Sequence, residues 1–123
     1  MKTVYIASPY AGDIEHNTDM ARKYCRHAAG QGVIPLAPHL LFTQFLNDNI
    51  PEEREQGCRM GMELLSTCDE LWVCGPRISN GMMAELAEAR RLGIQIQFIP
   101  AIEMQETPIH AQSPEQGMNM GCP

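Results

Sequence analysis

The chain has 123 residues, of which 44% are hydrophobic, which is enough for one domain with its own core. Its formal net charge of -6 argues against a nucleic-acid partner, because a phosphate backbone needs a basic surface. No segment approaches the length of a membrane span and no signal-peptide layout opens the chain, so we expect a cytoplasmic protein without a membrane partner.

The first third of the chain alternates strand and helix patterns. Residues 2–8 have strand propensities, and Pro9 ends that run. Residues 14–29 carry apolar side chains at helical spacing. A second strand is expected at residues 33–36. Pro35 places this strand at an edge of the sheet, because proline cannot donate a ladder hydrogen bond.

Two patterns follow the second strand. Residues 38–49 fit either a short amphipathic helix or a packed loop. A helix is then predicted from Pro51 to about Thr67, since proline suits the first helical turn and glutamates follow it. The residues expected on the inner face of this helix are Cys58, Met62 and Leu65.

The second half of the chain repeats the alternation. The short apolar run from Leu71 to Cys74 is typical of a strand buried on both faces. Residues 80–93 have helical spacing, and residues 94–99 alternate as a fourth strand does. Beyond this strand, residues 101–123 become polar and rich in proline and glycine, which predicts a tail without its own core.

These elements predict an α/β fold, a single-domain Rossmann-like (flavodoxin-like) parallel sheet of four to five strands with helices on both faces. The domain would span residues 1–100, and the expected strand order is 2-1-3-4. Ligands of such sheets bind where the order reverses, beyond the carboxyl ends of the strands. Here that point lies between the first and third strands, where the loops 8–13 and 75–81 would meet.

One carboxylate stands out near this point. Glu85 lies in the early turns of the helix that follows the third strand, so it would lean toward the ligand edge. His39 follows the second strand, either as a structural histidine or as a ligand contact. The chain has neither a GxGxxG fingerprint nor a P-loop lysine, and its cysteines form no CxxC pair. We therefore expect no cofactor and no metal.

Several segments resemble the nucleoside 2-deoxyribosyltransferase-like superfamily. They are Val-Tyr-Ile-Ala-Ser-Pro-Tyr at 4–10, Cys-Asp-Glu-Leu-Trp-Val at 68–73 and Ser-Asn-Gly-Met-Met-Ala-Glu at 79–85. The pattern is most similar to a small bacterial and phage branch, in which Ala-Pro-His at 37–39 and Pro-Glu-Glu-Arg at 51–54 also recur. The likeness extends through the fourth predicted strand.

This resemblance implies an N-glycosidase or deoxyribosyltransferase that acts on a nucleoside or nucleoside 5′-monophosphate. Glu85 matches the nucleophile that attacks C1′ of the sugar, and Tyr5 matches the tyrosine that orients it. Ser79, where transferases of free nucleosides carry an aspartate, is similar to relatives that hydrolyse deoxynucleoside 5′-monophosphates. The implied substrate-binding residues are Ser8, Pro9, Tyr10, His39, Ser79, Asn80 and Gly81.

One departure from the family pattern concerns the departing base. Active relatives carry an aspartate that helps to protonate it, and Gly61 occupies that position here. Glycosidic cleavage normally needs a proton donor besides the nucleophile. The alternative function is therefore a non-catalytic domain that binds a nucleotide or an ADP-ribose-like ligand. The resemblance also implies a homo-oligomer, either a dimer or a tetramer.

Overall fold

A computed structural model describes residues 1–100, so the predicted tail at 101–123 lies outside the described residues. Four parallel strands form one sheet in the order β2-β1-β3-β4, which confirms the predicted order. Pro35 pairs with Val4 on the edge strand β2, as expected. The strands are β1 (Thr3–Ala7), β2 (Ile34–Leu36), β3 (Glu70–Cys74) and β4 (Gln95–Ile99).

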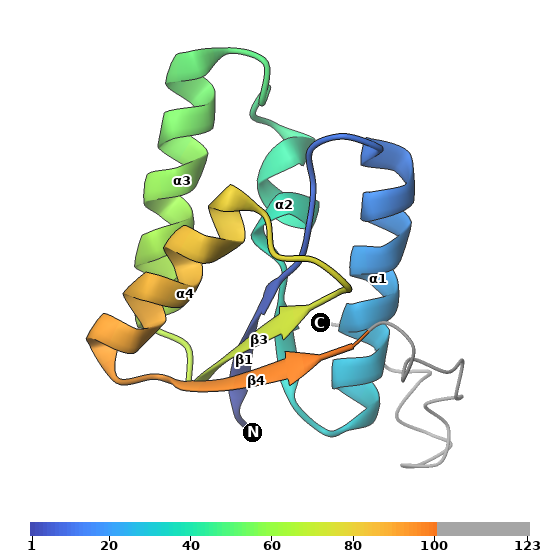
Figure 1. Cartoon of the computed structure of the whole chain (residues 1–123), viewed down its shortest axis with the longest axis vertical. Coiled ribbons are helices and arrows are strands. Elements are labelled where there is room, and N and C mark those ends of the chain that lie inside the picture. Colours follow the sequence, from blue (N-terminus) through green and yellow to red (C-terminus); the bar gives the residue numbers. More distant parts are fainter. Residues whose placement is uncertain (101–123) are drawn as a thin grey trace, which may run out of the picture.

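Helices cover both faces of the sheet, with α1 on one side and α3 and α4 on the other (Figure 1). The segment after β2, which the sequence left open, is a short helix followed by a 3₁₀ turn, η1. The helical elements are α1 (Ile14–Gly30), α2 (Pro38–Leu41), η1 (Phe42–Gln44), α3 (Pro51–Ser66) and α4 (Asn80–Leu92). Within residues 1–100, none of the helices combines the length and apolar character needed to cross a bilayer.

Alternation along the two central strands divides the core into two layers. Tyr5 and Leu71 point toward α3 and α4, where they pack with Leu65 and Leu86. The intervening residues point toward α1 and pack with Tyr24. Because successive side chains of a strand face opposite sides of the sheet, this split fixes which strand residues can meet α4.

The inner face of α3 differs from the prediction at one residue. Leu65 is buried and Met62 packs against the core, but Cys58 is exposed. The reason is visible in Figure 1, where the first half of α3 extends past the carboxyl ends of the strands. Helical spacing identifies the inward face but not where the sheet beneath it ends.

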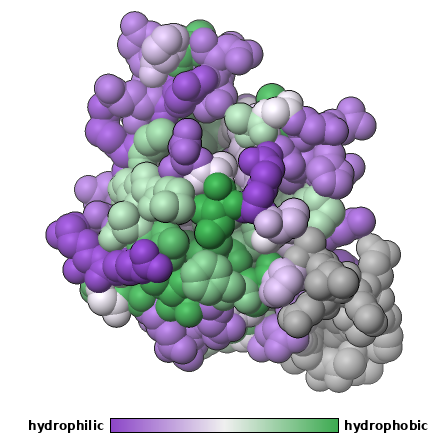
Figure 2. Space-filling model, viewed as in Figure 1, coloured by the Kyte–Doolittle hydropathy of each residue, from purple (hydrophilic) through white to green (hydrophobic). Residues whose placement is uncertain are grey.

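Apolar side chains also gather outside the core. Figure 2 shows hydrophobic residues over α4 and β4 on the face in view. The exposed hydrophobic residues of these two elements are Met83, Leu92 and Phe98. This surface is therefore less polar than a typical outer helix face.

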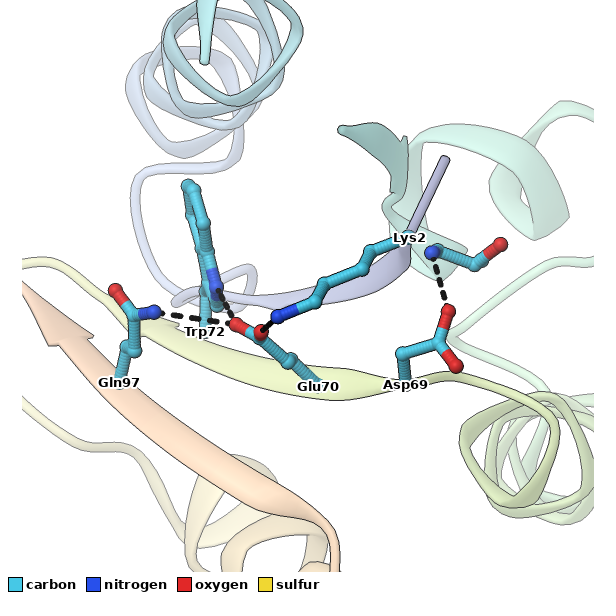
Figure 3. Close-up of polar contacts among 6 residues, drawn as sticks. Lys2, Asp69, Glu70, Trp72 and Gln97 are labelled. Carbon is cyan, nitrogen blue, oxygen red and sulfur yellow. Dashed lines mark hydrogen bonds and ion pairs between the residues drawn. The ribbon is translucent and has the colours of Figure 1, made fainter. Parts of the chain in front are cut away.

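At the beginning of β3, the buried carboxylate of Glu70 has partners at both oxygens (Figure 3). Glu70 is 4% exposed and accepts hydrogen bonds from Trp72 Nε1 at 3.0 Å and Gln97 Nε2 at 3.2 Å. Lys2 Nζ lies 2.7 Å from its other oxygen. The neighbouring Asp69 accepts a hydrogen bond from the Thr3 backbone N–H at 2.8 Å. Both carboxylates thus tie β1 to the beginning of β3.

Candidate active site

The two loops at the switch point lie against each other, as the strand order predicts. Gly75, which follows β3, adopts a φ of +113°, a region that favours glycine. A Cβ built there would lie 3.4 Å from Pro9 Cδ and 3.3 Å from the Tyr24 hydroxyl. The β1 loop and the β3 loop therefore form one continuous surface at the carboxyl edge of the sheet.

The central pair of the site is Tyr5 and Glu85. The Tyr5 hydroxyl donates a hydrogen bond to Glu85 Oε2. Tyr5 is 1% exposed in the central strand β1, and Glu85 is partly buried on the second turn of α4. The fold thus brings together two residues that are 80 positions apart in the sequence.

Burial controls the charge of this pair. It raises the pKa of Glu85 from its ordinary value of 4.5 to about 7, and the hydrogen bond from Tyr5 opposes that rise. Burial and the nearby Glu85 carboxylate raise the pKa of Tyr5, so the phenol stays protonated.

A glycine of α3 borders the same pair. Gly61 is buried, and a Cβ built on it would lie 3.1 Å from the Tyr5 hydroxyl oxygen. Position 61 therefore faces the catalytic candidates, as the resemblance implies, but it presents backbone rather than a carboxyl group. No cation forms an ion pair with Glu85 among the side chains of residues 1–100.

A second group of predicted residues gathers between β1 and β2. Ser8 Oγ lies 3.2 Å from His39 Nε2, and the His39 ring packs at 5.4 Å from that of Tyr10. Burial lowers the pKa of His39 to about 4, so this imidazole is neutral at neutral pH. His39 is thus suited to hold Ser8 in place, and it lacks the extra proton that an imidazolium acid would supply.

Asn17 supports this loop, although the sequence analysis did not single it out. Its buried side-chain amide donates hydrogen bonds to the backbone carbonyls of Tyr10 at 3.0 Å and Ala11 at 3.1 Å. The sequence does contain a signal, because Asn17 lies on the apolar stripe of α1 that includes Ala21 and Tyr24. A polar residue on a buried stripe usually has a backbone group to satisfy.

The start of α4 offers backbone donors to the site. Ser79 is the N-cap, and its hydroxyl accepts a hydrogen bond from the Met82 backbone N–H at 3.3 Å. The N–H groups of Asn80 and Gly81 belong to the first turn, where no intrahelical acceptor exists. Such a turn favours a negatively charged group.

A hollow of about 560 Å³ opens beside the Ser8–Tyr10 segment, and of the predicted site residues it includes Tyr10 but neither Tyr5 nor Glu85. It lies between the β1–α1 loop and residues 43–54. No cluster of three or more metal-binding side chains occurs in the described part of the chain.

Residues 2–99 match the protein-family model described as "Domain of unknown function (DUF7768)". That match covers nearly all of the described residues. The chain belongs to this DUF7768 family. A comparison of the sequence with curated proteins gives no match.

Solved structures place the DUF7768 chain in a known fold. It is similar to a 2-deoxyribosyltransferase from Bacillus psychrosaccharolyticus, with a TM-score of 0.61 and 18% identity over 80% of this chain and 72% of that one. It is also similar to a 2-deoxyribosyltransferase from Leishmania mexicana, with a TM-score of 0.58 and 19% identity over 93% and 72% of the two chains. The predicted nucleoside 2-deoxyribosyltransferase-like fold is confirmed.

Proposed function

We propose that this protein cleaves the N-glycosidic bond of a nucleoside or nucleoside 5′-monophosphate, with Glu85 as nucleophile and Tyr5 as the residue that orients it. One observation carries the proposal. Glu85 is partly buried at the switch point and receives its hydrogen bond from a fully buried tyrosine of the central strand. A solvated helix glutamate has no need of such a partner.

The chemistry follows from the pair. One oxygen of ionised Glu85 forms a bond to C1′ while the bond between C1′ and the base nitrogen breaks, and the base leaves with that electron pair and takes up a proton from solvent water. Water, or the nitrogen of a second base, then attacks C1′ and releases the carboxylate, and the proton that the attacking group loses passes to solvent. The Tyr5 hydrogen bond orients one carboxylate oxygen so that the other can attack.

A phosphorylated substrate fits the other predicted residues. The Asn80 and Gly81 N–H groups begin α4, and Ser79 caps it. Ser8 lies on the neighbouring loop, held by His39. Hydroxyl and amide donors of this kind bind a 5′-phosphate without a lysine. The two similar solved structures carry the name 2-deoxyribosyltransferase, which supports a 2-deoxyribose substrate.

The test is release of free base. The protein is incubated with each of the four deoxynucleoside 5′-monophosphates and with the corresponding nucleosides, and the base is separated by chromatography. We expect Glu85→Gln to lower the rate by roughly 1,000-fold or more. Glu88→Gln is the matched control, because Glu88 lies one turn further along α4 in an ion pair with Arg91. Release that survives Glu85→Gln overturns the assignment of the nucleophile.

Gly61 favours a second candidate function, the binding of a nucleotide or an ADP-ribose-like ligand without cleavage. A buried glycine faces the Tyr5 hydroxyl, so α3 brings no acid to protonate a departing base. Thermal shift with the same compounds separates the two functions, because a bound ligand raises the melting temperature whether or not it is cleaved. Stabilisation without product supports the binding function.

The proposal includes assembly into a homo-oligomer. Met83, Leu92 and Phe98 are exposed apolar residues on α4 and β4, and an interface there would remove them from water. Light scattering of the full chain gives the mass in solution. We expect Phe98→Lys to lower that mass if this surface forms the contact, and a monomeric wild type contradicts the assembly.

A further inference from the structure

Gly61 of α3 lies against the hydroxyl of Tyr5, one member of the proposed nucleophile pair. A Cβ built there would lie 3.1 Å from the Tyr5 hydroxyl oxygen, and ordinary contacts of such an atom begin at 3.4 Å. Gly61 is buried and lies inside a regular helix, where glycine is a poor helix former. Helix propensity therefore does not explain a glycine at position 61, whereas the close Tyr5 hydroxyl does, because it leaves little room for a side chain.

Tyr5 has little freedom to move away from a larger residue. It is 1% exposed, and its ring packs in the core layer that contains Leu65, Leu71 and Leu86. Its backbone pairs with β2 on one side and β3 on the other. The hydroxyl is tied to Glu85. Any displacement that a side chain at position 61 forces must therefore occur at the hydroxyl end of the ring.

We propose that Gly61 is a positioning residue: α3 passes so close to Tyr5 in this chain that only a residue without a side chain leaves the hydrogen bond from the Tyr5 hydroxyl to Glu85 undisturbed. Only the effect of Gly61 on catalysis rests on the proposed function. The geometry of the three residues is the same whether the ligand is cleaved or merely bound.

Gly61→Ala should act on Glu85 through Tyr5. The added methyl group displaces the phenol oxygen by a few tenths of an ångström and weakens its hydrogen bond to Glu85. Because this hydrogen bond lowers the pKa of Glu85, its weakening should raise that pKa further. The other titratable groups that act on Tyr5 are the Cys58 and Cys68 thiols, and the substitution leaves both in place.

The experiment follows the side-chain carboxyl carbon of Glu85 by NMR in protein labelled with ¹³C-glutamate, with the signal assigned by its loss in Glu85→Gln. We expect the titration midpoint of Gly61→Ala to lie above that of the wild type. Gly57→Ala is the matched control on the same helix, because its Cβ would meet only Leu46 Cδ1 at an ordinary 3.6 Å. It should leave the midpoint unchanged and raise the melting temperature, since alanine favours helix.

A double variant tests the route of the effect. In a Tyr5→Phe background the hydroxyl is absent, so adding Gly61→Ala should not change the Glu85 midpoint and should stabilise the helix as Gly57→Ala does. If Gly61→Ala alone does not fold, recovery of a cooperative melt in the double variant supports the same conclusion.

Two results overturn the inference: an unchanged midpoint in folded Gly61→Ala, or an equal rise in the Tyr5→Phe background. Neither result needs substrate. Failure of base release in the wild type would therefore count against the proposed function and leave the role of Gly61 to these titrations.

Discussion

Two glutamates, one at the beginning of β3 and one on the helix that follows its end, are buried in different ways. Glu70, at the beginning of β3, has partners from Lys2, Trp72 and Gln97, and the hydrogen bond from Lys2 is the main cause that lowers its pKa. The carboxylate of Glu85, beyond the end of β3, accepts one hydrogen bond from the side chains of residues 1–100, and burial raises its pKa to about 7. A carboxylate that holds the fold together is saturated with donors, whereas one available for chemistry keeps an oxygen free.

The largest expected effect comes from removing the saturated carboxylate. Glu70→Ala leaves the buried Trp72 N–H without its acceptor and separates the strand ends. We expect the free energy of unfolding to fall by about 3 kcal/mol, from an unpaired buried donor and lost charge-assisted hydrogen bonds. Urea denaturation measures it. Glu88→Ala, which removes a partly exposed carboxylate paired with Arg91, should change stability little, and an equal loss there would contradict the distinction.

At Glu85, in contrast, removing the charge should raise the free energy of unfolding at neutral and higher pH. Glu85 has a folded pKa of about 7 against an ordinary 4.5, so folding favours its protonated form. The wild type should lose stability as the pH rises from about 4.5 to 7, by at most roughly 3 kcal/mol. Glu85→Gln lacks this loss and should be the more stable protein at pH 8.

The difference between variant and wild type is the informative quantity in that experiment. His39, with a folded pKa of about 4 against an ordinary 6.5, opposes Glu85, because folding favours its neutral form and stability is lost as the pH falls through this range. Subtracting the two unfolding curves removes the His39 contribution. A difference that stays constant from pH 4 to 8 would contradict the raised pKa of Glu85.

Tyr5→Phe sharpens the comparison by removing the hydrogen bond that the Tyr5 hydroxyl donates to Glu85. Base release should fall by roughly 10- to 100-fold, which corresponds to about 1.4 to 2.7 kcal/mol of transition-state stabilisation. The hydrogen bond from Tyr5 lowers the pKa of Glu85, so its loss should raise that pKa. The acidic limb of the pH–rate profile should therefore move to higher pH. An unchanged pH profile would show that the tyrosine does not act on this carboxylate.

The smallest effect is expected at Asn17, which supports the loop between the two groups of site residues. Asn17→Ala removes two hydrogen bonds to the backbone of that loop. We expect about 1 kcal/mol of lost stability and weaker ligand binding with little change in the Glu85 titration. Calorimetry and urea denaturation check these two expectations. A shifted Glu85 titration would mean that the loop and the nucleophile pair are coupled.

The sequence contained most of the fold. Pro35 placed β2 at the edge because proline lacks an amide hydrogen, and the alternation of strands and helices gave the rest of the order. The inner face of α3 was predicted correctly at Leu65 and wrongly at Cys58. Periodicity gives the direction of a side chain, but the extent of the sheet beneath it depends on the tertiary arrangement.

The site was predictable in part. Family resemblance paired Tyr5 with Glu85, and the fold places them in contact. The hydrogen-bond partners of Glu70 were missed, since Lys2, just before β1, and Gln97, on β4, are distant from it in the sequence. The raised pKa of Glu85 was also missed, because burial is a property of the packed core and not of helix position.

The most direct measurement is a single ¹³C NMR titration of the wild-type protein in which the side-chain carboxyl signals of Glu85 and Glu70 are both followed. We predict a midpoint of about 7 for Glu85 and one below the ordinary 4.5 for Glu70. A Glu85 signal that titrates near 4.5 together with the surface glutamates would contradict the raised pKa of the proposed nucleophile.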